Sequence, residues 1–321
     1  MKLLKWLLSH QLKISKVKQK TGGFTLIELL VGLLLAFLVI TPLMGFMISV
    51  MENDRKEQAK VNTEQDIKAA LDYIARDLQQ AVYIYDADGI AAIRNQLPKS
   101  DNKTQFFPVL VFWKRQYIAG GLAVKNGNTT VGNDDTFVYS LVAYYLIKDG
   151  DSTWSNAARI GRFQISNGYG STTTEIENTR DPGFQLFSLQ DEGSLKTKMN
   201  KWVKKSSETY TQDVLPLVDY IDQTTTGTTT NSVPPSCATG QQMVPQYTGT
   251  GDAVATNDVK TRGFYVCVDS AKTVVEVHLR GNALARIQNN NINFNQNIPS
   301  TKMYFPESTI TVRGIGFLFT Q

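Results

Sequence analysis

The sequence predicts an α+β fold in which a long N-terminal helix, first transmembrane and then amphipathic, packs on an antiparallel β-sheet domain with long loops. Residues 29–51 carry no charge. Residues 53–85 repeat apolar side chains every three or four positions, and later β-branched and aromatic runs alternate with turn residues. We therefore expect a leader peptide over 1–23, a transmembrane helix over 24–51, an amphipathic stem helix over 52–85 and an extracytoplasmic β-rich domain over 86–321.

The charged residues of the expected leader are basic, and those just after the apolar run include two acids. Residues 1–23 hold six lysines and no acid, whereas Glu52 and Asp54 follow the run. The uncharged stretch is about 35 Å long as a helix, enough to cross a hydrocarbon core of about 30 Å. The positive-inside rule then predicts a single pass through the inner (plasma) membrane, with the leader in the cytoplasm and the large domain outside.

One acid, Glu28, stands at the edge of this segment. A carboxylate there is costly unless it is paired, and we expect its partner to be the α-amino group of Phe24, freed by cleavage after Gly23. Two alternatives stay open. The first is an uncleaved signal anchor, which would not explain why an acid stands at Glu28. The second is a secretory signal peptide, which usually has a shorter apolar run followed by an A-x-A cleavage site.

The run K-T-G-G-F-T-L-I-E-L-L-V-G (residues 20–32) resembles the cleavage signal of type IV pilins and of the pseudopilins of type II secretion systems. The resemblance implies that a prepilin peptidase cuts after Gly23 and methylates Phe24. It also implies that Glu28 neutralises the new N-terminal ammonium during filament assembly. The implied partners are that peptidase, other pilins or pseudopilins and an inner-membrane assembly platform, and the implied destination is a pilus or pseudopilus.

Pro42 lies close to the position at which these pilins often carry a helix-kinking proline, a few residues nearer the N-terminus. Proline removes one backbone hydrogen bond, and Gly32 and Gly45 weaken the surrounding helix. We expect a helix kink here, with local unwinding when the helix moves from lipid into a protein bundle. The alternative is a membrane proline that neighbouring groups accommodate.

The stem is amphipathic. Its expected apolar face consists of Ile67, Ala70, Leu71, Ile74, Leu78, Ala81, Val82 and Tyr85, and the opposite face carries Lys68, Asp72, Arg76 and Gln79. This pattern predicts a helix with one face on a domain, continuous with the membrane helix. The alternative is two helices separated near Asn62 and Thr63.

The stem run A-L-D-Y-I-A-R-D-L-Q-Q-A-V (residues 70–82) resembles large minor pilins and pseudopilins of the PilW/PulJ type. Together with Y-I-Y-D-A-D-G and P-V-L-V-F-W-K-R (108–115), it is similar to the pseudopilins of cyanobacterial hormogonium polysaccharide secretion. The resemblance covers the first 115 residues. It implies a pilin-like fold and a subunit that supports polysaccharide secretion and surface motility.

Strands are expected in the β-rich domain, with a hairpin turn at Asp269–Lys272. Their residues are 109–113, 137–147, 159–165, 184–189, 265–268, 273–279 and 309–319. Low-complexity stretches at 171–174, 224–230 and 288–297 predict mobile, solvated loops. An alternative function, a pilus-tip adhesin or ligand-binding module, would use these Thr- and Asn-rich loops.

The chain contains two cysteines, Cys237 and Cys267. Outside the cytoplasm we expect them to form one disulfide, which contributes about 3–4 kcal/mol in the chain-entropy model. The alternative is two separate buried thiols.

Charge and motifs exclude several function classes. The chain has 33 basic and 29 acidic residues, and removing the six leader lysines leaves 27 against 29, a net charge of −2. Nucleic acid is therefore not an expected partner. His278 is the one histidine outside the leader, and nucleophile-elbow, phosphate-loop and dinucleotide motifs are absent from the sequence, so we expect no enzyme. Paired carboxylates for glycoside hydrolysis stay open as an alternative.

No cofactor is expected. Two Asp-x-Asp pairs with a neighbouring glycine resemble fragments of calcium loops, but neither completes one. The weak calcium candidates are Asp86 and Asp88, and Asp149 and Asp151.

Overall fold

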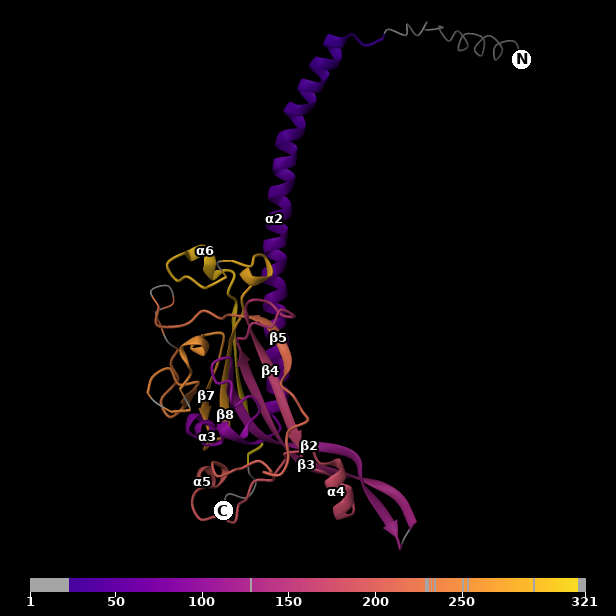
Figure 1. Ribbon diagram of the computed structural model, residues 1–321, viewed down its shortest axis with the longest axis vertical. Helices are drawn as coiled ribbons and strands as arrows, with labels where there is room; N and C mark the ends of the chain where they lie inside the picture. Colours follow the sequence, from indigo (N-terminus) through magenta and orange to yellow (C-terminus); the bar gives the residue numbers. More distant parts are fainter. Residues whose placement is uncertain are drawn as a thin grey trace, which may run out of the picture. The chain divides into compact units, whose positions relative to one another are not determined.

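The computed structural model describes residues 23–127, 129–228, 231, 233, 235–249, 251–252, 254–290 and 292–316 (Figure 1). Of the expected leader, residues 1–23, all but Gly23 lie outside the described residues. The chain divides into two units, Met1–Asp54 and Arg55–Gln321, and each is described by itself.

One helix, α2 (Leu26–Leu78), occupies most of the N-terminal region. It is continuous at Asn62 and Thr63, so the alternative of two separate helices is wrong. It also continues through Pro42, with the hydroxyl of Thr41 donating to the carbonyl oxygen of Phe37 at 2.7 Å. No turn is unwound here, and the kink or unwinding of this helix within a bundle stays a prediction.

Residues 55–78 of α2 belong to the second unit and show the expected amphipathicity. The apolar side chains predicted for its buried face from Ile67 to Leu78 are all buried. Lys68, Asp72 and Arg76 are exposed on the other face. Ala59, Thr63 and Ala75 extend the buried stripe.

The helix ends at Leu78 rather than at Tyr85, so the expected stem is too long. Ala81–Ile84 forms strand β1, in which all four residues are buried. Val82 and Tyr85 are buried as expected, but Val82 lies in β1 and Tyr85 directly follows that strand. A short apolar run next to a helix continues the helical pattern by chance, and periodicity alone does not separate the two.

The first sheet has five antiparallel strands in the order β1-β2-β3-β4-β5. After β1 come β2 (Phe106–Asn126), β3 (Thr129–Ile147), β4 (Ala158–Ser166) and β5 (Leu215–Ile221). The predicted strands 109–113, 137–147 and 159–165 all lie within these elements. The sequence reading missed β5, whose Pro216 suits an edge strand because proline cannot donate to a ladder.

The second sheet has four antiparallel strands in the order β6-β7-β8-β9. They are β6 (Gln242–Val244), β7 (Phe264–Asp269), β8 (Val274–Arg280) and β9 (Glu307–Arg313). The predicted hairpin is confirmed, since β7 pairs with β8 and the backbone N–H of Lys272 donates to the Asp269 carboxylate at 3.1 Å. The last predicted strand begins near the expected place and ends at Arg313, and its predicted residues 317–319 lie outside the described residues.

Short helices occupy the connections. They are α3 (Ala87–Ile93), η1 (Arg94–Gln96), α4 (Thr173–Thr179), α5 (Leu195–Met199), η2 (Asn257–Val259), η3 (Leu284–Arg286) and α6 (Pro299–Lys302).

Aromatic side chains cover one face of the first sheet. Trp113 of β2 meets Phe184, Phe187 and Trp202 edge to face, with ring centroids 5.0–5.8 Å apart. The predicted strand at 184–189 is wrong, because this segment is irregular and inserts its two phenylalanines toward Trp113 instead of pairing in a ladder.

The polar stretches are partly internal rather than wholly solvated. Thr224 and Asn231 are buried, and the Asn231 amide donates to the carbonyl oxygen of Thr224 at 3.1 Å. The buried Asn282 amide donates to the carbonyl oxygen of Ile292 at 2.7 Å. Within the predicted stretches, Thr224 and Ile292 are buried, and the backbone N–H of Phe294 donates to the Thr224 hydroxyl at 2.7 Å, so the expectation of solvated loops is wrong at these positions. Residues 171–174 are exposed, as expected.

Candidate functional site: the N-terminal helix and its anchorage

The residues that begin α2 form a helix cap. Gly23, Phe24 and Thr25 precede the helix, and the Thr25 hydroxyl accepts the backbone N–H of Glu28 at 3.3 Å. Thr25 and Glu28 thus occupy the first and fourth positions of the T-x-x-E pattern that opens many helices. The sequence interpretation assigned Glu28 a role in assembly and missed the cap, although the T-x-x-E spacing signals it.

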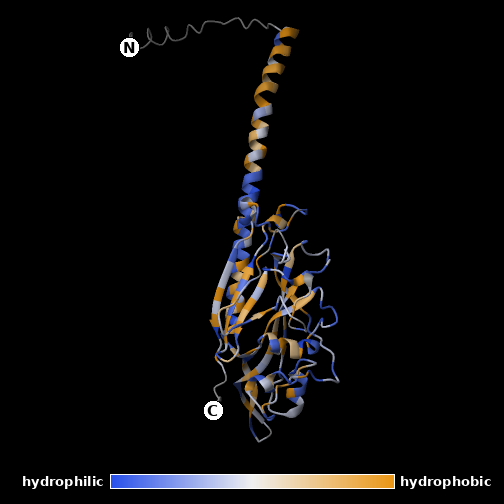
Figure 2. Ribbon diagram, turned by 90° about the vertical axis from the view of Figure 1, so that its left-hand side faces the viewer, coloured by the Kyte–Doolittle hydropathy of each residue, from blue (hydrophilic) through white to orange (hydrophobic). Residues whose placement is uncertain are grey.

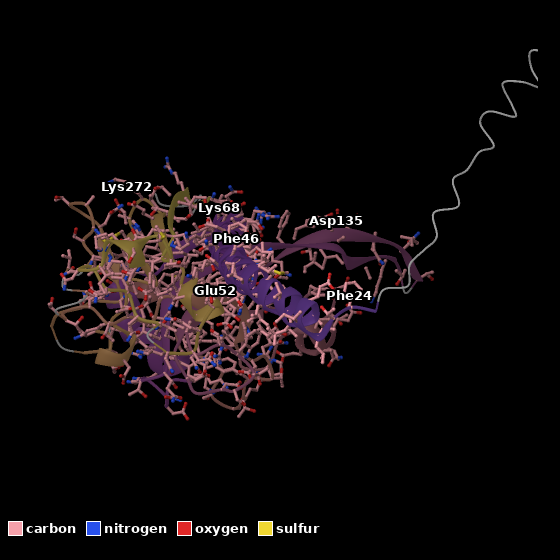
Figure 3. The ribbon with its side chains drawn as sticks, turned by 90° about the horizontal axis from the view of Figure 1, so that it is seen from above. Phe24, Phe46, Glu52, Lys68, Asp135 and Lys272 are labelled. Carbon is pink, nitrogen blue, oxygen red and sulfur yellow. A yellow bond between two sulfur atoms is a disulfide. The ribbon has the colours of Figure 1, made fainter. Side chains whose placement is uncertain are left out.

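The helix surface that follows is apolar on all sides. Large side chains from Leu26, which is 90% exposed, to Met51, which is 55% exposed, contact little else in the described structure. Figure 2 shows this part of α2 in the hydrophobic colour, and Figure 3 labels Phe24, Phe46 and Glu52 along it. By length and composition, α2 is the one helix among the described residues able to cross a membrane. Such a surface requires lipid or other apolar helices around it.

The last turn of α2 is tied to three strands through Asp77. Its carboxylate accepts from Lys114 Nζ of β2 at 2.8 Å, from Tyr144 Oη of β3 at 2.7 Å and from Arg162 Nε of β4 at 2.8 Å. Asp77, Lys114 and Tyr144 are buried and Arg162 is half-buried. We call these four residues the Asp77 cluster.

Electrostatics keep this carboxylate charged. Burial by itself raises the pKa of Asp77, but hydrogen bonds and charge from Arg162 and Lys114 outweigh it and leave the pKa lowered. Burial likewise raises the pKa of the Tyr144 hydroxyl, which remains a neutral donor to Asp77. The cluster therefore fixes the end of the helix on the sheet with satisfied charges.

Sequence reasoning missed the Asp77 cluster, although signals for it exist. Asp77 interrupts the buried face between Ile74 and Leu78, and Lys114 ends the apolar run of β2. A charge at a core position of one element calls for an opposite charge on the element that packs against it.

A second contact holds the middle of this helical stretch. The Arg286 guanidinium donates to the Thr63 hydroxyl at 2.9 Å, pairs with Asp66 and lies 4.0 Å from the centre of the Tyr220 ring. Beside it, Gly281 approaches the helix so closely that a Cβ atom would lie 2.5 Å from side-chain atoms of Thr63 and Ile67. Glycine is therefore required where β8 ends against α2.

The calcium candidates have other partners. Asp86 caps α3 through the N–H of Gly89 at 3.0 Å, and Lys196 Nζ lies 2.7 Å from both Asp86 and Asp88. Asp149 pairs with Arg159 at 2.6 Å, and Asp151 accepts the N–H of Thr153 at 2.9 Å. Within the described part of the chain, no three His, Cys, Asp or Glu side chains gather as metal ligands would.

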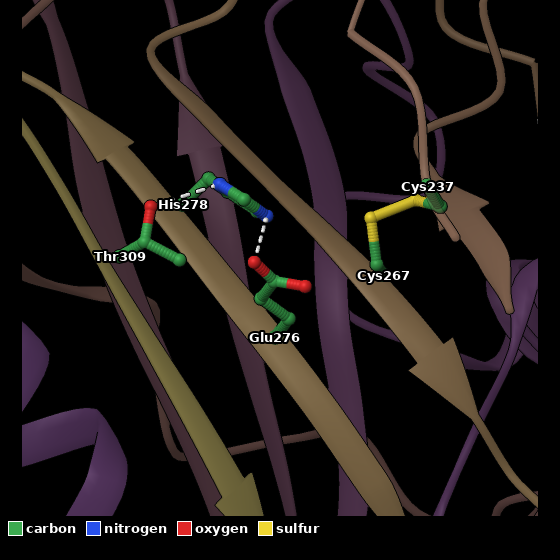
Figure 4. Close-up of a disulfide and its surroundings, with 5 residues drawn as sticks. All are labelled: Cys237, Cys267, Glu276, His278 and Thr309. Atoms are coloured by element: carbon green, nitrogen blue, oxygen red, sulfur yellow. Dashed lines mark hydrogen bonds and ion pairs between the residues drawn. A yellow bond between two sulfur atoms is a disulfide. The ribbon is translucent and has the colours of Figure 1, made fainter.

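The two cysteines form a disulfide, Cys237–Cys267, with Cα atoms 5.5 Å apart (Figure 4). It ties the segment that precedes β6 to the buried middle of β7. The sequence-based prediction of this bond is confirmed in the structure, and two separate thiols are not found.

Near the disulfide, His278 lies on the face of β8. Its Nδ1 is 3.0 Å from the Thr309 hydroxyl and its Nε2 is 3.3 Å from Glu276 (Figure 4). The ring stacks on Tyr265 with centroids 4.3 Å apart, and burial lowers the pKa of the imidazole. The histidine therefore packs between side chains of β7 and β9, the two strands that flank β8.

Replacing both cysteines with alanine is expected to destabilise the globular unit by about 3–4 kcal/mol, because the bond closes a chain separation of 30 residues. Urea unfolding of the detergent-solubilised chain measures the loss. Dithiothreitol should reproduce it in the wild type and leave the double variant unchanged. Equal unfolding midpoints for oxidised wild type and double variant would contradict this expectation.

Comparisons with family models, curated proteins and solved structures found no match for this chain. The geometry itself defines the class: an α+β protein with a long apolar N-terminal helix suited to a membrane and a disulfide-bonded, antiparallel β unit.

Proposed function

We propose that the chain is a non-enzymatic minor pilin or pseudopilin of the PilW/PulJ type. Prepilin peptidase processes it in the inner membrane, and it then joins a type IV pilus-like or type II secretion-like filament. The observation that carries the proposal is the start of α2, where G-G-F-T precedes a capped helix with one acid, Glu28, ahead of an uninterrupted apolar surface.

The mechanism is helix packing. The apolar side chains of residues 26–51 exchange lipid for the helices of neighbouring subunits. Glu28 pairs with the Phe24 ammonium of its own chain or of a neighbour, which removes two unpaired charges from a medium of low dielectric constant. The Thr25 cap supports this step, because it sets the first turn of the helix close to the new N-terminus.

The cargo and setting follow from resemblance. The segments at 70–82 and 108–115 are similar to the cyanobacterial hormogonium polysaccharide secretion pseudopilin HpsC. We therefore propose a filament that supports polysaccharide secretion and surface motility, assembled with other pilins on an inner-membrane platform.

A tip adhesin that uses the Thr- and Asn-rich loops is the rival function. The described residues favour the filament role, because the side chains of Thr224, Asn231 and Asn282 form hydrogen bonds within the globular unit. These side chains are therefore not presented to an external ligand. Deleting residues 224–231 would therefore disturb folding, and exposed positions of the same kind of stretch, such as Thr174, are the proper test of adhesion.

The protein extracted from membranes is expected to begin at N-methylated Phe24. Intact-mass and N-terminal peptide analysis of material expressed with and without a prepilin peptidase measures this directly. A Gly23→Val variant should keep residue Met1 in both cases. A wild-type chain that starts at Met1 in the presence of the peptidase would refute the proposal.

A further inference from the structure

A cavity of about 550 Å³ opens in the globular unit, and none of its lining residues belongs to α2. Its walls are the β7–β8 turn (270–273), the segment 313–316 that ends β9, and residues 194–196 at the start of α5. Tyr83 of β1 lines it as well. The volume suits a ligand of one or two sugar rings. Lys272 stands at the outer edge of the unit (Figure 3).

Three cations line the cavity, and they differ in what they contact. Lys196 is neutralised by Asp86 and Asp88, and Lys272 pairs with Asp269 at 2.8 Å. Arg313 forms no side-chain hydrogen bond or ion pair with any described residue. The cavity therefore offers one uncompensated guanidinium, whose planar fork matches a carboxylate.

Hydroxyl groups supply the remaining polar surface. Tyr83 is 2% exposed, and its hydroxyl has no hydrogen-bond partner among the described residues. A buried, unpaired hydroxyl is costly and indicates a missing partner. Ser270 donates to Asp86 at 3.0 Å and keeps its acceptor lone pairs. The Ser194 hydroxyl accepts the backbone N–H of Thr197 at 3.2 Å and bonds the Thr197 hydroxyl at 2.9 Å, which leaves it one further hydrogen-bonding position.

We infer that this cavity binds a hydroxyl-rich monoanion, namely an acidic sugar unit of the uronate type. Arg313 receives the carboxylate, while Tyr83, Ser270 and Ser194 exchange hydrogen bonds with the ring hydroxyls. Ala271, Leu195 and Ile315 contact the C–H faces of the sugar. The guanidinium of Arg313, which has no carboxylate partner among the described residues, favours an anion over a neutral sugar. The inference goes beyond the filament role and does not depend on it, since every lining residue belongs to the globular unit.

The test is titration of the full-length, detergent-solubilised protein with D-glucuronate by calorimetry or ligand-observed NMR. We expect a Kd of about 1 mM or tighter, weakening as salt is added. Glucose is the uncharged control, inorganic phosphate tests for a plain anion site, and a short peptide with a free C-terminus tests for a carboxylate site without sugar preference.

Two variants locate the binding. Arg313→Gln should weaken glucuronate binding by about tenfold or more, and Tyr83→Phe, which removes one oxygen, by about threefold or more. Arg76→Gln, the same change at an exposed position on α2, should bind as the wild type does.

Preferential binding of glucuronate that Arg313→Gln abolishes supports the assignment. The assignment is overturned by the absence of binding, by binding that Arg313→Gln leaves intact, or by phosphate, glucose or the peptide binding as tightly as glucuronate. Prepilin processing and filament incorporation are measured separately, so failure here leaves the filament proposal standing.

Discussion

A Glu28→Gln chain is expected to insert in the membrane and to be cleaved and methylated, yet to be almost absent from filaments. Glutamine preserves the T-x-x-E/Q cap with Thr25, so the helix should still begin at Leu26. The lost charge leaves the Phe24 ammonium unpaired among apolar helices. Removing one partner of a buried ion pair costs about 3–5 kcal/mol, which is a loss of more than a hundredfold in incorporation.

The measurement compares the amount of the subunit in sheared or purified filaments with the amount in the membrane. Glu52→Gln is the matched control, because it makes the same change on an exposed residue of the same helix beyond the apolar run. Thr25→Ala separates the cap from the charge, and it should weaken the first turn by about 1 kcal/mol and reduce incorporation modestly. If Glu28→Gln enters filaments as efficiently as Glu52→Gln, the charge of Glu28 has no part in assembly.

An Asp77→Asn substitution is expected to destabilise the globular unit by about 3–5 kcal/mol. Asparagine keeps the shape of the side chain, but Lys114 and Arg162 then face each other at a largely buried site without a counter-charge. Asp72→Asn is the control, since Asp72 lies five residues earlier on the exposed face of α2. Its effect should stay within about 0.5 kcal/mol.

Denaturant unfolding of the detergent-solubilised chains, followed by near-ultraviolet circular dichroism, measures both substitutions. Trp113 and its aromatic neighbours supply the signal from the first sheet. Similar unfolding free energies for Asp77→Asn and Asp72→Asn would show that the cluster contributes no stability.

The same cluster predicts a pH dependence with a definite sign. The folded pKa of Asp77 lies below its ordinary value of 3.8, so the folded state binds this proton less readily than the unfolded chain does. The contribution is thus fully present above pH 3.8 and is lost as the pH falls through the folded pKa. The difference in unfolding free energy between wild type and Asp77→Asn should shrink over that interval.

How much was predictable from sequence differs between elements. The amphipathic stretch around Ile67 to Leu78 and the β7–β8 hairpin were predicted because local patterns define them. The long central strands were also found, although β2 and β3 run well beyond the predicted residues.

The failures come from tertiary context. β1 was assigned to the helix because four consecutive buried residues match either element. Residues 184–189 alternate as a strand would, but Phe184 and Phe187 are placed by Trp113 rather than by a partner strand. Asp77 was overlooked since its partners lie 37 to 85 positions away in the sequence. The Arg313 cavity likewise joins segments that no local pattern connects.

The Asp77 cluster also affects how the globular unit resists a mechanical pulling force. A subunit held by its N-terminal helix would receive drag from extruded material or a surface through the end of α2. The carboxylate of Asp77 is bonded to β2, β3 and β4. A pulling force at Leu78 is therefore shared by three adjacent strands and does not act only on the short edge strand β1, which among the described strands pairs with β2 alone. Under such a force, the hydrogen bonds of Asp77 should break before the hydrogen bonds between the strands of the sheet.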